Sequence, residues 1–196
     1  MEVKTITVIG AGITGRGIAI AAARASYATI LEDVSDTILG DAMCWIRGVL
    51  DDDVRRGKLE AAARDAAIAR IATSKVVDEA IRDSDLIIEA VVDELEMKLE
   101  LFTIFDKFAK PNAIFATAAT AFGIGDFSDI VIFRERCIGM RFFDASDKKD
   151  HVEIICAPET SKEIVATCVA VVRRMNKTAV IADEPQAATR EQITGN

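Results

Sequence analysis

The chain is poor in several residue types that functional sites often require. Its 196 residues include one histidine, one tryptophan, one tyrosine and three prolines. The chain has four cysteines without any Cys-x-x-Cys spacing, namely Cys44, Cys137, Cys156 and Cys168. Only one histidine, His151, is available to join them as a metal ligand. We therefore expect buried, reduced thiols that pack as small apolar side chains, and no metal site.

An excess of positive charge is also missing from the composition. The chain has 32 acidic residues against 24 basic residues, which gives a formal net charge of −8. A protein that binds the phosphate backbone of nucleic acid needs a positive face, because neutralising phosphates supplies most of the non-specific affinity. We therefore expect no nucleic-acid partner.

The N-terminus has neither the pattern of a signal peptide nor that of a membrane span. The chain begins MEVKTITVIGAG, in which charged residues precede a short apolar run that breaks at Gly10. This pattern predicts a cytoplasmic protein with no membrane association. A content of 51% hydrophobic and 29% charged residues predicts a sizeable buried core rather than disorder.

Strand-like and helix-like runs alternate along the chain. Strands are expected at 4–9, 29–31, 85–92, 113–116, 137–143, 152–155 and 179–181, and helices at 17–25, 36–45, 95–109 and 160–175, with 51–72 as a helical excursion broken near Gly57. This alternation predicts one α/β domain, built as a Rossmann-like, doubly wound and mainly parallel sheet with helices on both faces.

A glycine motif joins the first expected strand to the first expected helix. Gly10, Gly12 and Gly15 form the pattern Gly-x-Gly-x-x-Gly. In this setting the first glycine permits a tight turn, the second lets the backbone approach a pyrophosphate, and the third lets helix and strand pack closely. Glycines that serve only packing in another α/β protein are the alternative interpretation.

An acidic pair closes the second expected strand. Asp33 lies 18 residues after Gly15, where a carboxylate can accept hydrogen bonds from the adenosine ribose. No basic residue follows in Val34-Ser35-Asp36 to neutralise a 2′-phosphate, so NAD is favoured over NADP. We expect the neighbouring Glu32 to be a solvated surface carboxylate.

Longer stretches resemble one family. VIGAGITGRGIAIAAA, LEDVS, DSDLIIEAVVDELEMKLELF, CIGMRFFDA and VEII resemble the NAD-binding domain of L-3-hydroxyacyl-CoA dehydrogenases, and the likeness covers nearly the whole chain. It implies oxidation of a 3-hydroxyacyl-CoA to a 3-ketoacyl-CoA with NAD, as in fatty-acid β-oxidation. It also implies an NAD-binding domain over 1–185 and a polar tail over 186–196, ahead of a helical dimerisation domain that this chain lacks. We therefore expect self-association or a separate chain that supplies the helical domain.

The resemblance assigns cofactor positions residue by residue. The matching positions are Gly10, Gly12, Ile13, Thr14 and Gly15 at the pyrophosphate turn, Asp33 at the ribose, Ala90, Val91 and Asp93 after the strand that ends near residue 92, and Lys98 near the nicotinamide side. Thr14 stands where the family usually has methionine, and Asp93 where it has glutamate. The alternative for Lys98 is an exposed helix residue that pairs with Glu94.

The catalytic positions depart from the family pattern. The resemblance places Arg141 at the catalytic histidine, Thr117 at a serine that holds the substrate oxygen, and Glu153 at the glutamate that orients the histidine. An asparagine of the family is Ala118 and another is Asp144. Arginine stays protonated and has no acceptor, so it cannot act as a general base.

Two uses of these altered residues stay open. Arg141 is expected to form a bidentate ion pair with Glu153, and the alternative is that it clamps a carboxylate or a CoA phosphate. His151 lies two residues from Glu153 on an expected strand, so both side chains share one face. It is either a residue at the rim of the site or a relocated base.

Three functions are compatible with these residues. The first is an NAD-dependent oxidoreductase of the 3-hydroxyacyl-CoA dehydrogenase type, impaired or dependent on a partner. The second is a non-catalytic NAD-binding scaffold or a pseudo-subunit of a heteromeric dehydrogenase. A different Rossmann enzyme that uses a lysine fits the long stretches less well.

Overall fold

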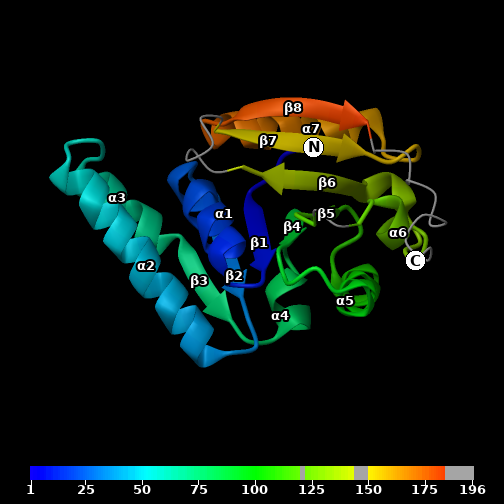
Figure 1. The fold of residues 1–196 in the computed structure, drawn as a ribbon, viewed down its shortest axis with the longest axis horizontal. Helices are drawn as coiled ribbons and strands as arrows, with labels where there is room; N and C mark the ends of the chain where they lie inside the picture. Colours follow the sequence, from blue (N-terminus) through cyan, green and yellow to red (C-terminus); the bar gives the residue numbers. More distant parts are fainter. Residues whose placement is uncertain (120–121, 144–149, 184–196) are drawn as a thin grey trace, which may run out of the picture.

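The computed structural model describes residues 1–119, 122–143 and 150–183. In this part of the chain eight strands form one sheet with the order β3-β2-β1-β4-β5-β6-β7-β8 (Figure 1). All neighbouring strands are parallel except β6 and β7, which are antiparallel. The strands are β1 (Thr5–Ile9), β2 (Ala28–Glu32), β3 (Ile71–Ser74), β4 (Leu86–Glu89), β5 (Ile114–Thr117), β6 (Cys137–Phe142), β7 (His151–Cys156) and β8 (Thr178–Asp183).

Helices cover both faces of this sheet. They are α1 (Ile13–Arg24), α2 (Asp36–Arg55), α3 (Ala61–Ala69), α4 (Val77–Ile81), α5 (Leu95–Phe108), α6 (Gly125–Ser128) and α7 (Lys162–Arg174), with a short 3-10 turn at Arg134–Arg136. Buried side chains of α1, α2, α3 and α7 pack on the face that includes Val8 and Ile88. Those of α4, α5 and α6 pack on the face that includes Ile87 and Phe115. The predicted doubly wound, mainly parallel α/β fold is therefore confirmed.

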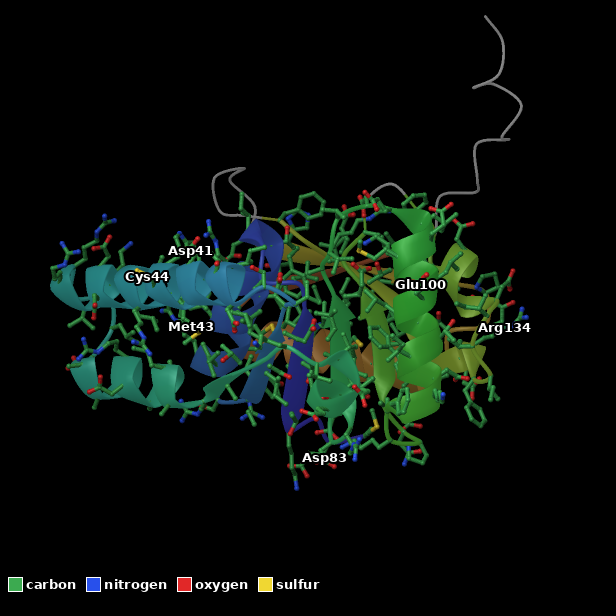
Figure 2. All side chains as sticks on the ribbon, turned by 90° about the horizontal axis from the view of Figure 1, so that it is seen from below. Asp41, Met43, Cys44, Asp83, Glu100 and Arg134 are labelled. Carbon is green, nitrogen blue, oxygen red and sulfur yellow. The ribbon has the colours of Figure 1, made fainter. Side chains whose placement is uncertain are left out.

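The helical excursion expected over 51–72, with a break near Gly57, is confirmed at the break but not at its two ends. Helix α2 continues to Arg55 rather than ending at Trp45, and Gly57 then turns the chain with a φ of +67°. Residues 71–72, the expected end of this excursion, belong to strand β3 rather than to a helix, because the backbone of β3 pairs in parallel with β2. A segment of four residues is too short for its hydrophobic pattern to distinguish a strand from a helix. Pairing with the neighbouring strand β2 therefore determines its conformation. Figures 1 and 2 show α2 and α3 running side by side away from the sheet.

The strand expected over 85–92 is also shorter than predicted. Strand β4 ends at Glu89, and the next N–H outside the ladder, that of Val91, donates to the Glu89 carboxylate at 2.7 Å. A side chain that bonds its own backbone two residues on turns the chain out of a sheet. The apolar residues 90–92 therefore form a loop at the sheet edge.

The expectation of four buried thiols holds for only two of them. Cys137 and Cys168 are buried, and burial raises the pKa of each thiol to about 12. Cys156 is half-buried, and Cys44 is exposed on α2 (Figure 2), because it lies on the helix face that points away from the core. None of the helices in the described ranges is long and apolar enough to cross a membrane.

Candidate cofactor and substrate site

The site lies at one edge of the sheet, where the parallel strands β1, β2, β4 and β5 all end. The strand register aligns Glu32, Ile9, Glu89 and Thr117 in one row across these four strands. The chain crosses from one side of β1 to the other between β3 and β4, so the direction of winding changes beside β1 and β4. Ligands of open α/β sheets bind at such a switch point, outside the carboxyl ends of the strands.

The glycine turn forms a cradle at this edge. Gly10 has a φ of +97°, and a Cβ there would lie 2.9 Å from the Ala90 carbonyl oxygen. A Cβ on Gly15 would lie 1.7 Å from the Gly10 carbonyl oxygen, whereas a Cβ on Gly12 would meet nothing within 4 Å. Gly10 and Gly15 therefore hold the turn tight, and the space beside Gly12 is open.

Helix α1 begins inside this cradle. Its N-cap is Gly12, which has no side chain to satisfy the first N–H groups of the helix, and Gly12, Ile13 and Thr14 are all exposed. A helix N-terminus with free N–H groups attracts phosphate. Together with the open space beside Gly12, this start of α1 fits the pyrophosphate of a dinucleotide.

Asp33 follows β2 and points toward the glycine turn. Its Oδ2 accepts a hydrogen bond from Ala11 N at 3.0 Å, and its Oδ1 accepts one from Ser35 N at 3.0 Å. These two bonds fix the orientation of the carboxylate. A carboxylate can accept about four hydrogen bonds, so roughly two sites stay open for ribose hydroxyls.

The prediction that Glu32 is a solvated surface carboxylate is wrong. The residue is 2% exposed, because β2 is covered on both faces and flanked by β1 and β3. Among the described residues its Oε1 finds no hydrogen-bond partner. Burial, and secondarily the charge of Asp33, raise the pKa of Glu32 to about 7.

A buried polar network connects β4, β5 and α5. Glu89 is fully buried, its Oε1 accepts from Lys98 Nζ at 2.6 Å, and its Oε2 accepts from the Thr117 hydroxyl at 2.6 Å. Sequence reasoning did not select Glu89 as a site residue. A single glutamate within the apolar run DLIIEAVV was the signal that could have identified it, because an ionised side chain in a covered strand needs partners.

The structure contradicts the alternative interpretation of Lys98 as an exposed helix residue that pairs with Glu94. Its side chain is 1% exposed, and besides Glu89 its Nζ contacts Asp93 Oδ1 at 3.1 Å and the Val91 carbonyl oxygen at 3.4 Å. The ammonium group has three donors and meets three acceptors here. The arrangement brings together three residues that the sequence assigned to the cofactor: Val91, Asp93 and Lys98.

Thr117 lies at the end of β5 and is 2% exposed. While its hydroxyl donates to Glu89, its oxygen accepts a hydrogen bond from Ala119 N at 3.0 Å. The hydroxyl proton is therefore committed inside the protein in this conformation. Asp144, a further position of the resemblance, lies outside the described residues.

Arg141 and Glu153 are placed opposite each other on the antiparallel strands β6 and β7. The expected bidentate ion pair is not formed, because Arg141 Nε donates to the Ala119 carbonyl oxygen at 2.9 Å, and among the described residues no ion pair within 4 Å joins Arg141 to Glu153. The guanidinium instead reaches toward the chain that follows β5. It thereby lies on the Thr117 side of the site.

His151 and Glu153 share one face of β7, as predicted. The His151 Nε2 and Glu153 Oε1 atoms are 4.0 Å apart, and the imidazole stacks on Phe143 with a centroid separation of 4.5 Å. This separation is too long for a hydrogen bond. The structure thus brings the two groups near each other without pairing them as an acid–base dyad.

A separate cleft of about 350 Å³ lies between the first half of α2 and the end of β3. It is lined by Asp36, Leu39, Gly40, Met43, Thr73, Ser74 and Lys75. None of these residues was assigned to the cofactor or to the chemistry. The N-terminus of α1 and Asp33 converge at the glycine turn and not in this cleft.

Comparison with known proteins agrees with this geometry. The family described as "3-hydroxyacyl-CoA dehydrogenase, NAD binding domain" matches residues 5–185. The chain is 29% identical over 184 residues to a fatty acid oxidation complex subunit alpha of Shewanella halifaxensis, a match that covers 93% of this chain and 26% of the relative. The chain thus spans about a quarter of the length of the curated relatives it matches.

Solved structures give the same result. A 3-hydroxybutyryl-CoA dehydrogenase from Escherichia coli K12 superposes with a TM-score of 0.89 at 28% identity, over 93% of this chain and 39% of that chain. An (S)-3-hydroxybutyryl-CoA dehydrogenase from Ralstonia eutropha superposes with a TM-score of 0.88 at 26% identity, over 94% of this chain and 65% of that chain. The chain therefore belongs to the 3-hydroxyacyl-CoA dehydrogenase family, of which it carries the NAD-binding domain.

Proposed function

We propose that this chain is the cofactor-binding part of an NAD-dependent oxidoreductase that interconverts 3-hydroxyacyl-CoA and 3-ketoacyl-CoA, and that its own catalytic site is impaired or needs a partner chain. The names of its relatives, which include fatty acid oxidation complex subunits, support the substrate class. The observation that carries the impairment is Arg141, a permanent cation at the position of the family's base.

The described residues fit the dinucleotide. Gly12, Ile13 and Thr14 would hold the pyrophosphate at the start of α1, and Asp33 would accept the ribose hydroxyls. The loop 90–93 would pass along the cofactor beside Gly10. When bound, NAD accepts a hydride from the carbon that carries the substrate hydroxyl.

The substrate side consists of Thr117, Arg141 and Glu153. Arg141 would attract the substrate oxygen or another anionic group, because its guanidinium keeps its positive charge. Glu153 lies opposite it on β7 and has lost the histidine that it orients in the family. General-base assistance of this kind contributes about a hundred- to ten-thousand-fold, and this chain lacks it at position 141.

A non-catalytic NAD-binding scaffold or pseudo-subunit is the second candidate. It is favoured by two contacts that engage the altered groups inside the protein: Arg141 Nε with the Ala119 carbonyl oxygen, and the Thr117 hydroxyl with Glu89. Both candidates agree with an association with a second copy or with a separate helical-domain chain. A cytoplasmic location stays a prediction.

The test is the oxidation of NADH at 340 nm with acetoacetyl-CoA at high protein concentration, alongside NADH binding followed by fluorescence. Under the proposal NADH binds and turnover is weak, and turnover rises when a partner chain with the helical domain is added. NADH binding with no turnover under either condition would favour the scaffold. A failure to bind NADH would contradict both candidates.

A further inference from the structure

Glu89 is the most connected buried acid of the described chain, and neither the proposed hydride transfer nor the cofactor contacts use it. Its carboxylate accepts three hydrogen bonds, from Val91 N at 2.7 Å, Lys98 Nζ at 2.6 Å and the Thr117 hydroxyl at 2.6 Å. Its carbonyl oxygen also accepts from Ala118 N at 2.8 Å. One residue thereby holds the two chain segments that leave the sheet after β4 and after β5.

The segment after β4 depends on this carboxylate for its shape. The Val91 N–H bonds to Glu89, and the Val91 carbonyl oxygen receives Lys98 Nζ at 3.4 Å. The Glu89–Lys98 ion pair therefore holds both the N–H and the carbonyl oxygen of Val91. The preceding residue, Ala90, presents its carbonyl oxygen to Gly10, where an added Cβ would lie only 2.9 Å away. A shift of the loop would therefore move the floor of the glycine turn.

We propose that Glu89 is a positioning residue for NAD: it fixes the loop 90–93 against the glycine turn through Val91 and Lys98, and fixes Thr117 at the neighbouring strand end. This inference rests on the proposed use of the loop by the cofactor. Glu89 itself is fully buried and does not face the ligand. It acts through the backbone of Val91.

A role in stability alone is the competing explanation. Replacing a buried ion pair by apolar residues of similar volume is often neutral for folding, whereas removing one partner is costly. The double substitution Glu89→Leu with Lys98→Met therefore removes the positioning contacts while leaving a packed interior. Glu89→Gln keeps the shape, and its amide oxygen can still accept from Val91 N–H and Lys98, but without the negative charge. Its amide nitrogen would donate to Thr117, so the polarity of that contact reverses.

The experiment measures NADH affinity by fluorescence titration at a temperature where circular dichroism shows each variant folded. We expect Glu89→Gln and the double variant to weaken NADH binding by about tenfold or more, since Val91 N–H loses its charged acceptor. Glu96→Gln removes an exposed acid from the same helix as Lys98 and should leave the affinity unchanged. Affinity equal to that of the wild type in a folded double variant would overturn the proposal.

A second readout needs no cofactor. Hydrogen exchange of the Val91 amide should be slow in the wild type and accelerate about tenfold or more in Glu89→Gln, while exchange within β1 stays unchanged. If the wild-type amide exchanges as fast as in the variant, Glu89 does not hold this loop and the inference fails. If the wild type does not bind NADH but the Val91 amide is protected through Glu89, the proposed function fails and the positioning of the loop stands.

Discussion

Arg141 and Glu153 face each other across β6 and β7, but the Arg141 guanidinium bonds to the Ala119 carbonyl oxygen instead of to the carboxylate. The pair is therefore not a closed salt bridge that fills a dead site. The Nε donor of Arg141 is thereby engaged by the chain that follows β5. Among the described residues, the basic group within 4.0 Å of the Glu153 carboxylate is the His151 imidazole.

Restoring the family's histidine at this place should recover little activity. Ala118 and Asp144 also depart from the family pattern, so Arg141→His supplies a base without the groups that hold the substrate. We expect a gain below about a hundredfold, the lower end of what general-base assistance contributes. NADH oxidation with acetoacetyl-CoA checks this, with Arg141→Gln as the control for loss of charge. A larger gain in the single variant would mean that the remaining site is intact.

Asp33 should determine NADH affinity through the ribose. Asp33→Asn keeps an oxygen for one of the two backbone N–H groups, so the loop is perturbed less than by alanine. We expect weaker NADH binding by about tenfold, the cost of hydrogen bonds to a charged group. Asp36→Asn is the matched control, because Asp36 is an exposed acid that lies three residues after Asp33 and pairs with Lys75. Equal affinity of wild type and Asp33→Asn would refute the ribose assignment.

Gly15 should tolerate no side chain, in contrast to Gly17 on the same helix. A Cβ on Gly15 would lie 1.7 Å from the Gly10 carbonyl oxygen, whereas a Cβ on Gly17 would meet nothing within 4 Å. Gly15→Ala should lower the free energy of unfolding by about 1–3 kcal/mol or more and abolish NADH binding. Gly17→Ala should raise it by roughly 0.5–1 kcal/mol, since alanine favours helix. Urea denaturation of both variants measures the difference, and equal stability would contradict the close packing of the turn.

Glu32 should make the protein less stable as the pH rises. The pKa of this carboxyl group is raised from 4.5 to about 7, so between these values the folded protein keeps a proton that the unfolded chain releases. The free energy of unfolding therefore falls with rising pH across this window. Glu32→Gln cannot titrate, so it does not show this loss of stability with rising pH. The stability of the variant minus that of the wild type should therefore increase between about pH 5 and pH 8, by roughly 1–3 kcal/mol, since one pKa unit corresponds to about 1.4 kcal/mol.

Urea denaturation at the two pH values tests this expectation. Glu96→Gln, which changes an exposed acid, should show no such difference. A constant offset between Glu32→Gln and wild type at both pH values would mean that Glu32 titrates normally.

The chain should self-associate or bind a partner at micromolar concentration. Apolar side chains are exposed on the segment between α6 and β6, where Ile132 is 75% and Phe133 is 48% exposed, beside the partly exposed Ile130. Contiguous exposed apolar groups of this kind mark interaction sites. Sedimentation velocity at tens of micromolar is the measurement, and Ile132→Asp should reduce association if this segment takes part. A monodisperse monomer in the wild type would contradict the expectation.

The sequence alone determined the architecture, the cofactor and the anomaly at position 141. These predictions rest on local signals: the alternation of strand and helix patterns, the glycine motif between the first strand and helix, and the acid at the end of the second strand. Each signal can be interpreted from residues close together in the sequence. Arg141 cannot act as a base in any fold, so the absence of a base at this position follows from the residue type alone.

Only the tertiary structure decided the state of the charged groups. Glu32 was predicted to be a surface residue, and for Lys98 exposure stayed open as the alternative, but both side chains are buried. Burial depends on which strands and helices lie beside a residue, and its own sequence neighbours do not show this. The same holds for strand β3, whose four residues gain their conformation from pairing with β2. Glu89 bonds to Thr117, which lies 28 positions later in the chain. The two residues are neighbours only because β4 and β5 pair in the parallel sheet.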